Sequence, residues 1–310
     1  MANFTMVTGF LLMTFSNTWQ LQVLHAMLFL LIYLVAVIGN LLIFTTISLD
    51  EHLHSPMYFF LKNLSFLDLC FISTTLPKSI TNSLSCSRSI SFMGCVLQFF
   101  LVIFFAASEL FLLTVMSYDR YVAICQPLHY EVIMTRRACV KMATVSWLSG
   151  GLFGTLYSTN TFTLPFCNSK EIHQFFCDFP SLLRLSCSSI HIGLDVTLAL
   201  GVVSGIFCFI SIAISYGPIF STVLKIPTTE GQSKAFSTCL PHLIVLMIFI
   251  TTSVIVYLKP PQKQPDSILD LLLSIFYTVV PPTMNPIIYS LRNKDIKISL
   301  RKLLAWKHFS

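Results

Sequence analysis

Seven long apolar segments dominate this chain and limit what it can fold into. Each is close to the roughly 20 residues that an α-helix needs to cross the hydrocarbon core of a bilayer. Apolar residues run continuously through each segment without strict alternation, which favours helices over the strands of a membrane barrel. The segments lie at about residues 23–47, 57–80, 92–122, 139–163, 195–223, 235–258 and 268–290. We therefore expect an all-α membrane protein, with residues 1–310 forming a single seven-transmembrane helix bundle.

The composition agrees with a lipid environment. Only 10% of the residues are charged, whereas a soluble domain carries about 25% charged residues. The net charge of +6 is not gathered in a basic domain, so we expect the lipid bilayer and no nucleic acid as a partner. The chain shows no nucleophile–base arrangement, phosphate-binding loop or zinc signature, so we expect no enzyme.

The basic residues are distributed unevenly between the two sides of the predicted bundle. Thirteen of the 19 Lys and Arg residues fall on the side that includes the C-terminal segment, and such an excess marks the cytoplasmic side. We therefore expect residues 1–22 outside the cell and residues 291–310 inside, with Asn3 in NFT as a glycosylation acceptor. No Lys or Arg precedes Lys62, so we expect the first span to act as an uncleaved signal-anchor.

Four cysteines lie on the predicted outer side, where disulfides persist. Cys95 opens the third span, while Cys167, Cys177 and Cys187 crowd the loop between the fourth and fifth spans. Four cysteines allow three sets of pairings, and the sequence alone does not choose among them. If all four form disulfides, no thiolate is left to bind a metal ion beside the histidines of this loop. We therefore expect no metal dependence there.

The stretch MSYDRYVAIC, residues 116–125, sets an acid and a base side by side at the inner end of the third span. An Arg at the edge of the hydrocarbon is costly, on the order of 3 kcal/mol. In one interpretation, Arg120 is an interfacial residue whose long side chain reaches water. In the other, Arg120 and Asp119 form a functional ion pair. Neighbouring residues on a helix point in different directions, so Asp119 can hold Arg120 only loosely, and such a pair can be broken.

This stretch resembles the signature at the inner end of the third helix of odorant receptors, which are rhodopsin-like seven-helix receptors. Further motifs match the family in order across nearly the whole chain. They are GN at 39–40, LHSPMYFFL at 53–61, LSFLDLC at 64–70, SY at 215–216, KAFSTC at 234–239 and NPIIYSLRN at 285–293. One such motif would be a weak signal, whereas six in the expected order and spacing are strong.

The resemblance implies a receptor that activates a G protein. In receptors of this kind the Arg is held in the resting state and then turns toward the C-terminal helix of the G protein. The residues with implied coupling or switch roles are Asp119, Arg120, Tyr121, Tyr216, Asn285, Pro286 and Tyr289. The implied partner is the heterotrimeric stimulatory olfactory-type G protein, which raises cAMP. An export chaperone is a further candidate partner, and the implied location is the plasma membrane of olfactory neuron cilia. We also expect a Cys95–Cys177 disulfide, with Cys167–Cys187 as the second.

Two acids, Asp68 and Glu109, lie deep in their spans. Glu109 lies about 16 Å along the helix axis from Arg120, near the middle of the bilayer. In one interpretation, the two acids gather with Asn40, Asn285 and Ser108 around a sodium ion or waters. In the other, Glu109 is neutral and hydrogen-bonded within the bundle. We expect no other cofactor.

The seventh span and the segment after it carry two further patterns. Three prolines in PPTMNPIIY (281–289) each remove a backbone donor and bend the helix, either as a hinge or as a static kink. Beyond them, apolar residues recur at helical spacing opposite basic residues, which predicts a short amphipathic helix on the inner leaflet. The apolar stripe consists of Ile296, Leu300, Leu303 and Leu304.

A seven-helix bundle binds small molecules between its helices, in the outer half. On the third span the predicted wall is Phe99, Val102, Ile103, Ala106 and Ala107, and the other candidates are Leu200, Ser204, Ser253, Tyr257 and Thr278. This wall is apolar with scattered hydroxyls, which favours a small organic odorant. The family comparison disfavours an amine, because Val102 stands where amine receptors carry an Asp, and retinal, because 268–290 contains no Lys. In the alternative interpretation, any one of these residues is ordinary helix-packing material.

Two alternatives to an odorant receptor follow from the same pattern. A secondary transporter or channel would predict paired repeats and several charges at the midplane, and the chain has no clear repeat and only two deep acids. A non-olfactory chemosensory receptor of the same fold is the second alternative.

The sixth span departs from the family pattern: FITT (249–252) offers Ile250 and Thr251 where Tyr and Gly are usual, which puts an aromatic switch there in doubt. Pro241 stands where Ser is usual.

Overall fold

The computed structural model describes residues 8–13, 18–85, 88–166, 170–187, 192–225, 228–258 and 267–306. Within these ranges the side chains of 234–238, 252–258, 267–271, 291–292 and 304–306 are not described. Asn3 and Cys167 therefore lie outside the described residues, as do the side chains of Ser253, Tyr257 and Leu304.

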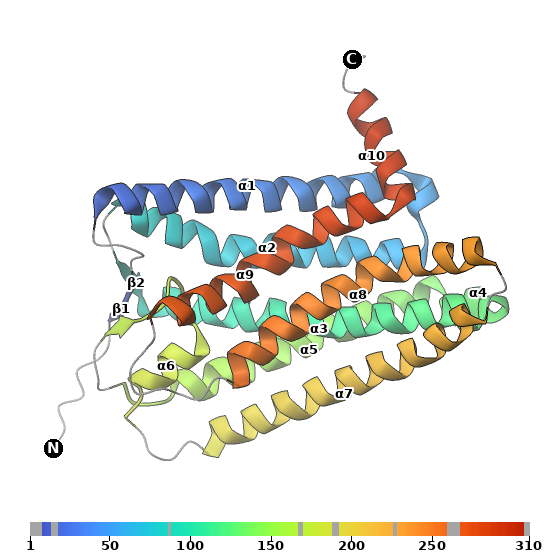
Figure 1. The fold of residues 1–310 in the computed structure, drawn as a ribbon. Helices are drawn as coiled ribbons and strands as arrows, with labels where there is room; N and C mark the ends of the chain where they lie inside the picture. Colours follow the sequence, from blue (N-terminus) through green and yellow to red (C-terminus); the bar gives the residue numbers. More distant parts are fainter. Residues whose placement is uncertain are drawn as a thin grey trace.

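Seven long helices run side by side through the described part of the chain (Figure 1). They are α1 (Trp19–Leu49), α2 (Pro56–Ser85), α3 (Phe92–Cys125), α5 (Arg136–Phe162), α7 (Ile192–Leu224), α8 (Thr229–Leu258) and α9 (Ser267–Arg292). Each corresponds to one predicted span, so the predicted helix bundle is confirmed. Among the described residues, α1, α2, α3 and α7 are long and apolar enough to cross a membrane on length and composition alone.

Short helices cluster at one end of the bundle. They are η1 (Glu51–Leu53), η2 (Pro127–His129), α4 (Tyr130–Ile133) and α10 (Lys294–Trp306). The α10 helix leaves the bundle at an angle to α9 (Figure 1), and the Asn293 side chain begins it by accepting hydrogen bonds from the backbone N–H groups of Asp295 and Ile296. Ile296 is buried, and Leu300 and Leu303 are half-buried. These contacts agree with the predicted amphipathic stripe.

A small sheet covers the opposite end of the bundle (Figure 1). Its strands are β1 (Gly9–Leu12), β2 (Ser89–Ser91) and β3 (Glu171–Ile172), in the order β2–β1–β3. β1 pairs antiparallel with β2 and parallel with β3. The same end holds the short helix α6 (Phe179–Leu185). The sequence did not predict this sheet, because four residues beside the N-terminus show no pattern that requires partners so far along the chain.

The buried residues form two hydrophobic clusters. The larger one extends through the helix bundle. The smaller one lies beneath the sheet and includes Phe10, Phe99 and the disulfide-bonded Cys95 and Cys177. α3 packs against α2, α5, α7 and α8, and its contact with α5 is the most extensive. Two glycines on α5, Gly150 and Gly154, allow this approach, because a Cβ atom on either would press against the backbone of α3. Residues at both ends of this central helix form the candidate site.

Candidate functional site

At the C-terminal end of α3, Arg120 is held by the residue beside it. Its Nε donates to Asp119 Oδ2 at 3.0 Å, and a second guanidinium nitrogen contacts the same oxygen. The Arg120 side chain is only 11% exposed and that of Asp119 only 1%. Arg120 is therefore mostly covered and paired with Asp119, which favours the ion pair over the interfacial alternative.

The second oxygen of Asp119 has a partner that the sequence did not reveal. Tyr130, the first residue of α4, donates its hydroxyl hydrogen to Asp119 Oδ1 at 2.8 Å. Burial raises the pKa of Tyr130 above its usual value, and the negative charge of Asp119 raises it further. The hydroxyl therefore keeps its proton and can donate. Asp119 is thus shared between Arg120 on its own helix and the loop that follows α3.

His242 forms a second link, which joins α3, α7 and α8. One ring nitrogen lies 2.6 Å from the Tyr216 hydroxyl, and Nε2 lies 3.1 Å from the carbonyl oxygen of Leu113. A carbonyl oxygen can only accept, so Nε2 carries hydrogen and, in the neutral ring, Nδ1 accepts from Tyr216. The sequence alone did not indicate this role for His242. A His within the apolar stretch CLPHLIVL was nevertheless a usable signal, because a polar ring there needs partners.

The remaining tyrosines implied as switch residues have different surroundings. Tyr289 is buried, and its hydroxyl has no hydrogen-bond partner within the described residues. The Tyr121 hydroxyl accepts from Gln126 at 3.3 Å. In the part of the chain that the structure describes, no hydrogen bond joins Tyr216 or Tyr289 to Arg120. Their switch roles stay predictions.

The two deep acids meet through one amide. Asn285 Nδ2 lies 2.9 Å from Asp68 Oδ2 and 3.4 Å from Glu109 Oε1. Both acids are 1% exposed, and Asp68 Oδ1 and Asn285 Oδ1 have no hydrogen-bond partner among the described residues. Unpartnered buried oxygens fit a hard cation or water, because both satisfy oxygen acceptors.

Two further residues expected in this acidic cluster, Ser108 and Asn40, have other contacts. The Ser108 hydroxyl faces α5, where a Cβ atom on Gly150 would lie 2.0 Å from it. The Asn40 side-chain nitrogen donates to the carbonyl oxygens of Ala36 and Pro282, at 3.0 and 2.8 Å. Including Ser108 in the cluster was therefore wrong, because the close α3–α5 contact turns it away. Asn40 instead holds α1 to the proline-rich part of α9.

The predicted ligand wall is partly inside the bundle. Phe99, Val102 and Thr278 are buried, and Ile103, Ala106, Ala107 and Ser204 are half-buried. Thr278 and Ser204 each donate to the carbonyl four residues earlier on their own helix. Leu200 is 47% exposed, so its assignment to the interior was wrong; its side chain lies on the surface of α7. Ligand contact by the other residues stays a prediction.

The N-terminal end of α3 is tied to the loop before α7. A disulfide joins Cys95 to Cys177, as predicted. Beside it, the Gln98 side chain accepts from the Cys177 backbone N–H and donates to the Thr74 carbonyl, both at 3.0 Å. One amide therefore joins α2, α3 and the loop, a role for Gln98 that the sequence did not suggest.

The second predicted disulfide, Cys167–Cys187, is supported by the chain around it. Cys187 is disulfide-bonded, and Cys167 lies outside the described residues. Phe166 and Ser186 face each other in an antiparallel bridge, and the Cys187 N–H donates to the Pro165 carbonyl at 3.0 Å. The pairing itself stays a prediction.

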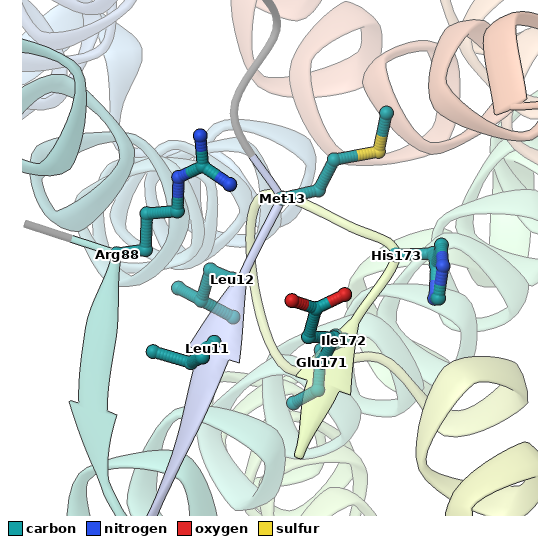
Figure 2. Close-up of a pocket in the computed structure, with 7 residues that line it drawn as sticks. All are labelled: Leu11, Leu12, Met13, Arg88, Glu171, Ile172 and His173. Atoms are coloured by element: carbon teal, nitrogen blue, oxygen red, sulfur yellow. The ribbon is translucent and has the colours of Figure 1, made fainter. Parts of the chain in front are cut away.

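A cleft of about 190 Å³ lies on the sheet and not between the helices. Figure 2 shows its lining residues: Leu11, Leu12, Met13, Arg88, Glu171, Ile172 and His173. Its rim carries charged side chains, in contrast to the apolar wall on α3. The cleft therefore does not coincide with the predicted ligand site.

The seven long helices form a bundle with the rhodopsin fold. The crystal structure of squid rhodopsin superposes with a TM-score of 0.70 at 15% sequence identity, over 94% of this chain and 87% of that one. The olfactory receptor family profile matches residues 29–307. Human olfactory receptors 14A2 and 14A16 are 60% and 58% identical, over 98% and 99% of this chain and 96% and 99% of their own lengths. The chain belongs to the olfactory receptor family, whose members are multi-pass receptors and not enzymes.

Proposed function

We propose that this chain is an odorant receptor that binds a small, mostly apolar organic ligand between the outer halves of its helices. On binding, it activates the stimulatory olfactory-type G protein and raises cAMP. The observation that carries this proposal is the buried Arg120, held by Asp119 at the inner end of the helix whose outer half carries Phe99 and Val102. An apolar wall favours ligands bound by desolvation and dispersion.

The inner end of α3 suits a switch because its contacts can be exchanged. Asp119 holds Arg120 with one oxygen and Tyr130 with the other. His242 holds α8 to α3 and α7. In the proposed mechanism, Arg120 leaves Asp119 and faces the G protein while α8 separates from α3. A ligand drives this change only to the extent that it binds the open arrangement more tightly than the closed one.

We further propose that a sodium ion or water occupies the space beside Asp68, Glu109 and Asn285. The support is the buried and unpartnered oxygens of Asp68 and Asn285. A cation there would favour the ionised carboxylates and stabilise one arrangement of α2, α3 and α9. Replacement of sodium by N-methylglucamine should then change agonist potency. If potency stays the same, the site holds water and not sodium.

The location of the receptor is also a proposal. We propose that the segment before α1 faces outside, with Asn3 glycosylated, and that α10 lies at the cytoplasmic face of the plasma membrane of olfactory cilia. The support is the uneven distribution of basic residues, and we propose an export chaperone as a helper for delivery. Antibodies against epitope tags at the two ends, applied to intact cells, should label only the N-terminal tag. Labelling of the C-terminal tag would overturn this orientation.

The first prediction tests the signalling role of Arg120. The receptor, expressed with the olfactory G protein, is screened against an odorant panel with cAMP as the readout. Arg120→Ala should abolish the response while surface expression persists, because the side chain proposed to contact the G protein is missing. Arg137→Ala is the matched control: Arg137 is exposed at the start of α5, and its loss should preserve the response. A full cAMP response from Arg120→Ala would contradict the proposal.

A further inference from the structure

The strand β1 is built into the outer end of the receptor. It is the central strand of the sheet, so both of its edges are occupied. The N–H groups of Leu11, Leu12 and Met13 donate to the carbonyls of Lys170, Arg88 and Gln174, at 2.8, 2.8 and 3.0 Å. These carbonyls belong to the loops before α3 and after α5. The N-terminal segment therefore joins two loops that would otherwise be separate.

The two faces of β1 have different environments, as the alternation of a strand requires. Phe10 and Leu12 face inward and are each 2% exposed, whereas Leu11 faces outward and is 40% exposed. Phe10 pairs with Ile90 and Leu12 with Ile172 in the sheet register, and both partners are buried. These inward side chains belong to the same hydrophobic cluster as Phe99. Ile103, another residue of the predicted ligand wall, packs against that cluster.

A chain of aromatic contacts leads from β1 to the ligand wall. Phe10 lies 6.1 Å from Phe92 and 5.6 Å from Phe166, measured between ring centroids. Phe92 meets Phe162 edge to face at 5.5 Å, and Phe162 meets Phe99 in the same way at 5.5 Å. Buried aromatic rings in such contacts restrain one another, because close packing leaves little room for other rotamers.

We propose that β1 is the roof of the ligand site and that Phe10 is a positioning residue for ligand selectivity. Phe10 acts through Phe92 and Phe162, which hold the ring of Phe99 in the wall. The ligand class, a small apolar organic molecule, rests on the proposed function; the roof itself rests on the burial and contacts of β1. A shorter side chain at position 10 leaves a void beneath the sheet. Phe99 then gains room, and the site accepts longer ligands.

The first arm of the experiment measures the roof without any signalling. A cysteine is introduced by Ile103→Cys in the full-length receptor, and intact cells are treated with a membrane-impermeant methanethiosulfonate. When Ile103→Cys is combined with Phe10→Ala, the rate of modification at position 103 should rise about tenfold, because loss of a large buried side chain opens the cluster. Leu11→Ala, on the outer face of the same strand, is the matched control and should leave the rate unchanged. The receptor without Ile103→Cys reports the background from native cysteines.

The second arm measures selectivity with straight-chain alcohols from hexanol to dodecanol. Phe10→Ala should raise the potency of dodecanol relative to hexanol about tenfold, whereas Leu11→Ala should preserve the ratio. A merely structural role would lower surface density and maximal response for all alcohols without changing their relative potency. If Phe10→Ala does not reach the surface, Phe10→Leu replaces it, because Leu stays apolar but cannot make the ring contacts.

The two arms separate this inference from the proposed function. If no alcohol raises cAMP in the unchanged receptor, the first arm alone decides, and faster modification supports the roof even though the proposed ligand class fails. If modification at position 103 is equally fast with and without Phe10→Ala, the roof is overturned. If modification changes but potency ratios do not, Phe10 closes the site without setting selectivity, and the positioning role is overturned.

Discussion

His242 joins three helices near the proposed switch. Its ring bonds with Tyr216 on α7 and with the Leu113 carbonyl on α3, while its own backbone belongs to α8. Arg120 is paired with Asp119 in the same structure, so the His242 link belongs to the closed arrangement. A ring that accepts from one helix and donates to another holds three helices together at one point.

The second prediction follows at this residue. His242→Phe should raise basal cAMP several-fold, because the closed arrangement loses two hydrogen bonds, each worth about 1 kcal/mol, while the aromatic volume is kept. The measurement is ligand-free cAMP normalised to surface expression. Tyr216→Phe, which removes only the hydroxyl, should raise it less. Basal activity at or below that of the unchanged receptor in both variants would show that the link does not restrain the closed arrangement.

At the scale of the helices, the contact between α3 and α5 is closest at Gly150. A Cβ atom on Gly150 would lie 2.5 Å from the Phe104 carbonyl oxygen and 3.0 Å from the Ser108 nitrogen, both backbone atoms of α3. Its neighbour Gly151 has only the edge of the Phe104 ring nearby, at 3.8 Å. The two glycines therefore differ in whether the partner helix must move.

The third prediction uses this pair. Gly150→Ala should destabilise the receptor by about 1–3 kcal/mol, because overpacking pushes α3 and α5 apart. Gly151→Ala is the matched control, and it should be neutral or slightly stabilising because Ala favours helix by about 1 kcal/mol over Gly. The thermal unfolding midpoint of the detergent-purified receptor measures both. Equal midpoints for the two variants would mean that the helices absorb the extra methyl group without cost.

At the scale of the whole molecule, α3 is anchored at both ends by distant parts of the chain. The disulfide to Cys177 spans 82 residues of sequence, and β1 brings the N-terminal segment to the same end. At the other end, α4 and His242 contact the helix. The N-terminal end of α3 thus has covalent and sheet contacts, and its C-terminal end has polar contacts that can be exchanged. This asymmetry suits the proposed function, in which the ligand binds near the first end and the second end changes its contacts.

The fourth prediction tests the covalent anchor. Cys95→Ser should reduce surface delivery strongly, because loss of a disulfide that closes a long loop typically costs about 2–5 kcal/mol. Cys70→Ser is the control, since Cys70 is a free, half-buried thiol on α2, and delivery should persist. Flow cytometry with an N-terminal tag gives the measurement. Normal delivery of Cys95→Ser would show that the outer loops fold without the bridge.

Much of this architecture could be predicted before the structure was known. The seven spans were predictable because the requirement for about 20 apolar residues is local and strong. The Asp119–Arg120 pair and the Cys95–Cys177 bridge followed from motifs that resemble a known family. The residues that were missed, His242, Tyr130 and Gln98, share one property: their partners lie on other elements, and each looks ordinary in its local sequence.

The sequence by itself determined a seven-helix membrane receptor and its Asp119–Arg120 ion pair. The lengths of the apolar runs, the basic residues and the motifs were sufficient, because each of these signals acts within one helix or one loop. Only the tertiary structure decided which side chains meet. It brought Asp68 and Glu109 to one amide, turned Ser108 toward Gly150 and left Leu200 on the surface. It also placed Phe10 in one cluster with Phe99, a residue of the predicted ligand wall, through a sheet formed by distant segments. The physical reason is that helix rotation and strand pairing depend on packing between segments, which local periodicity does not encode.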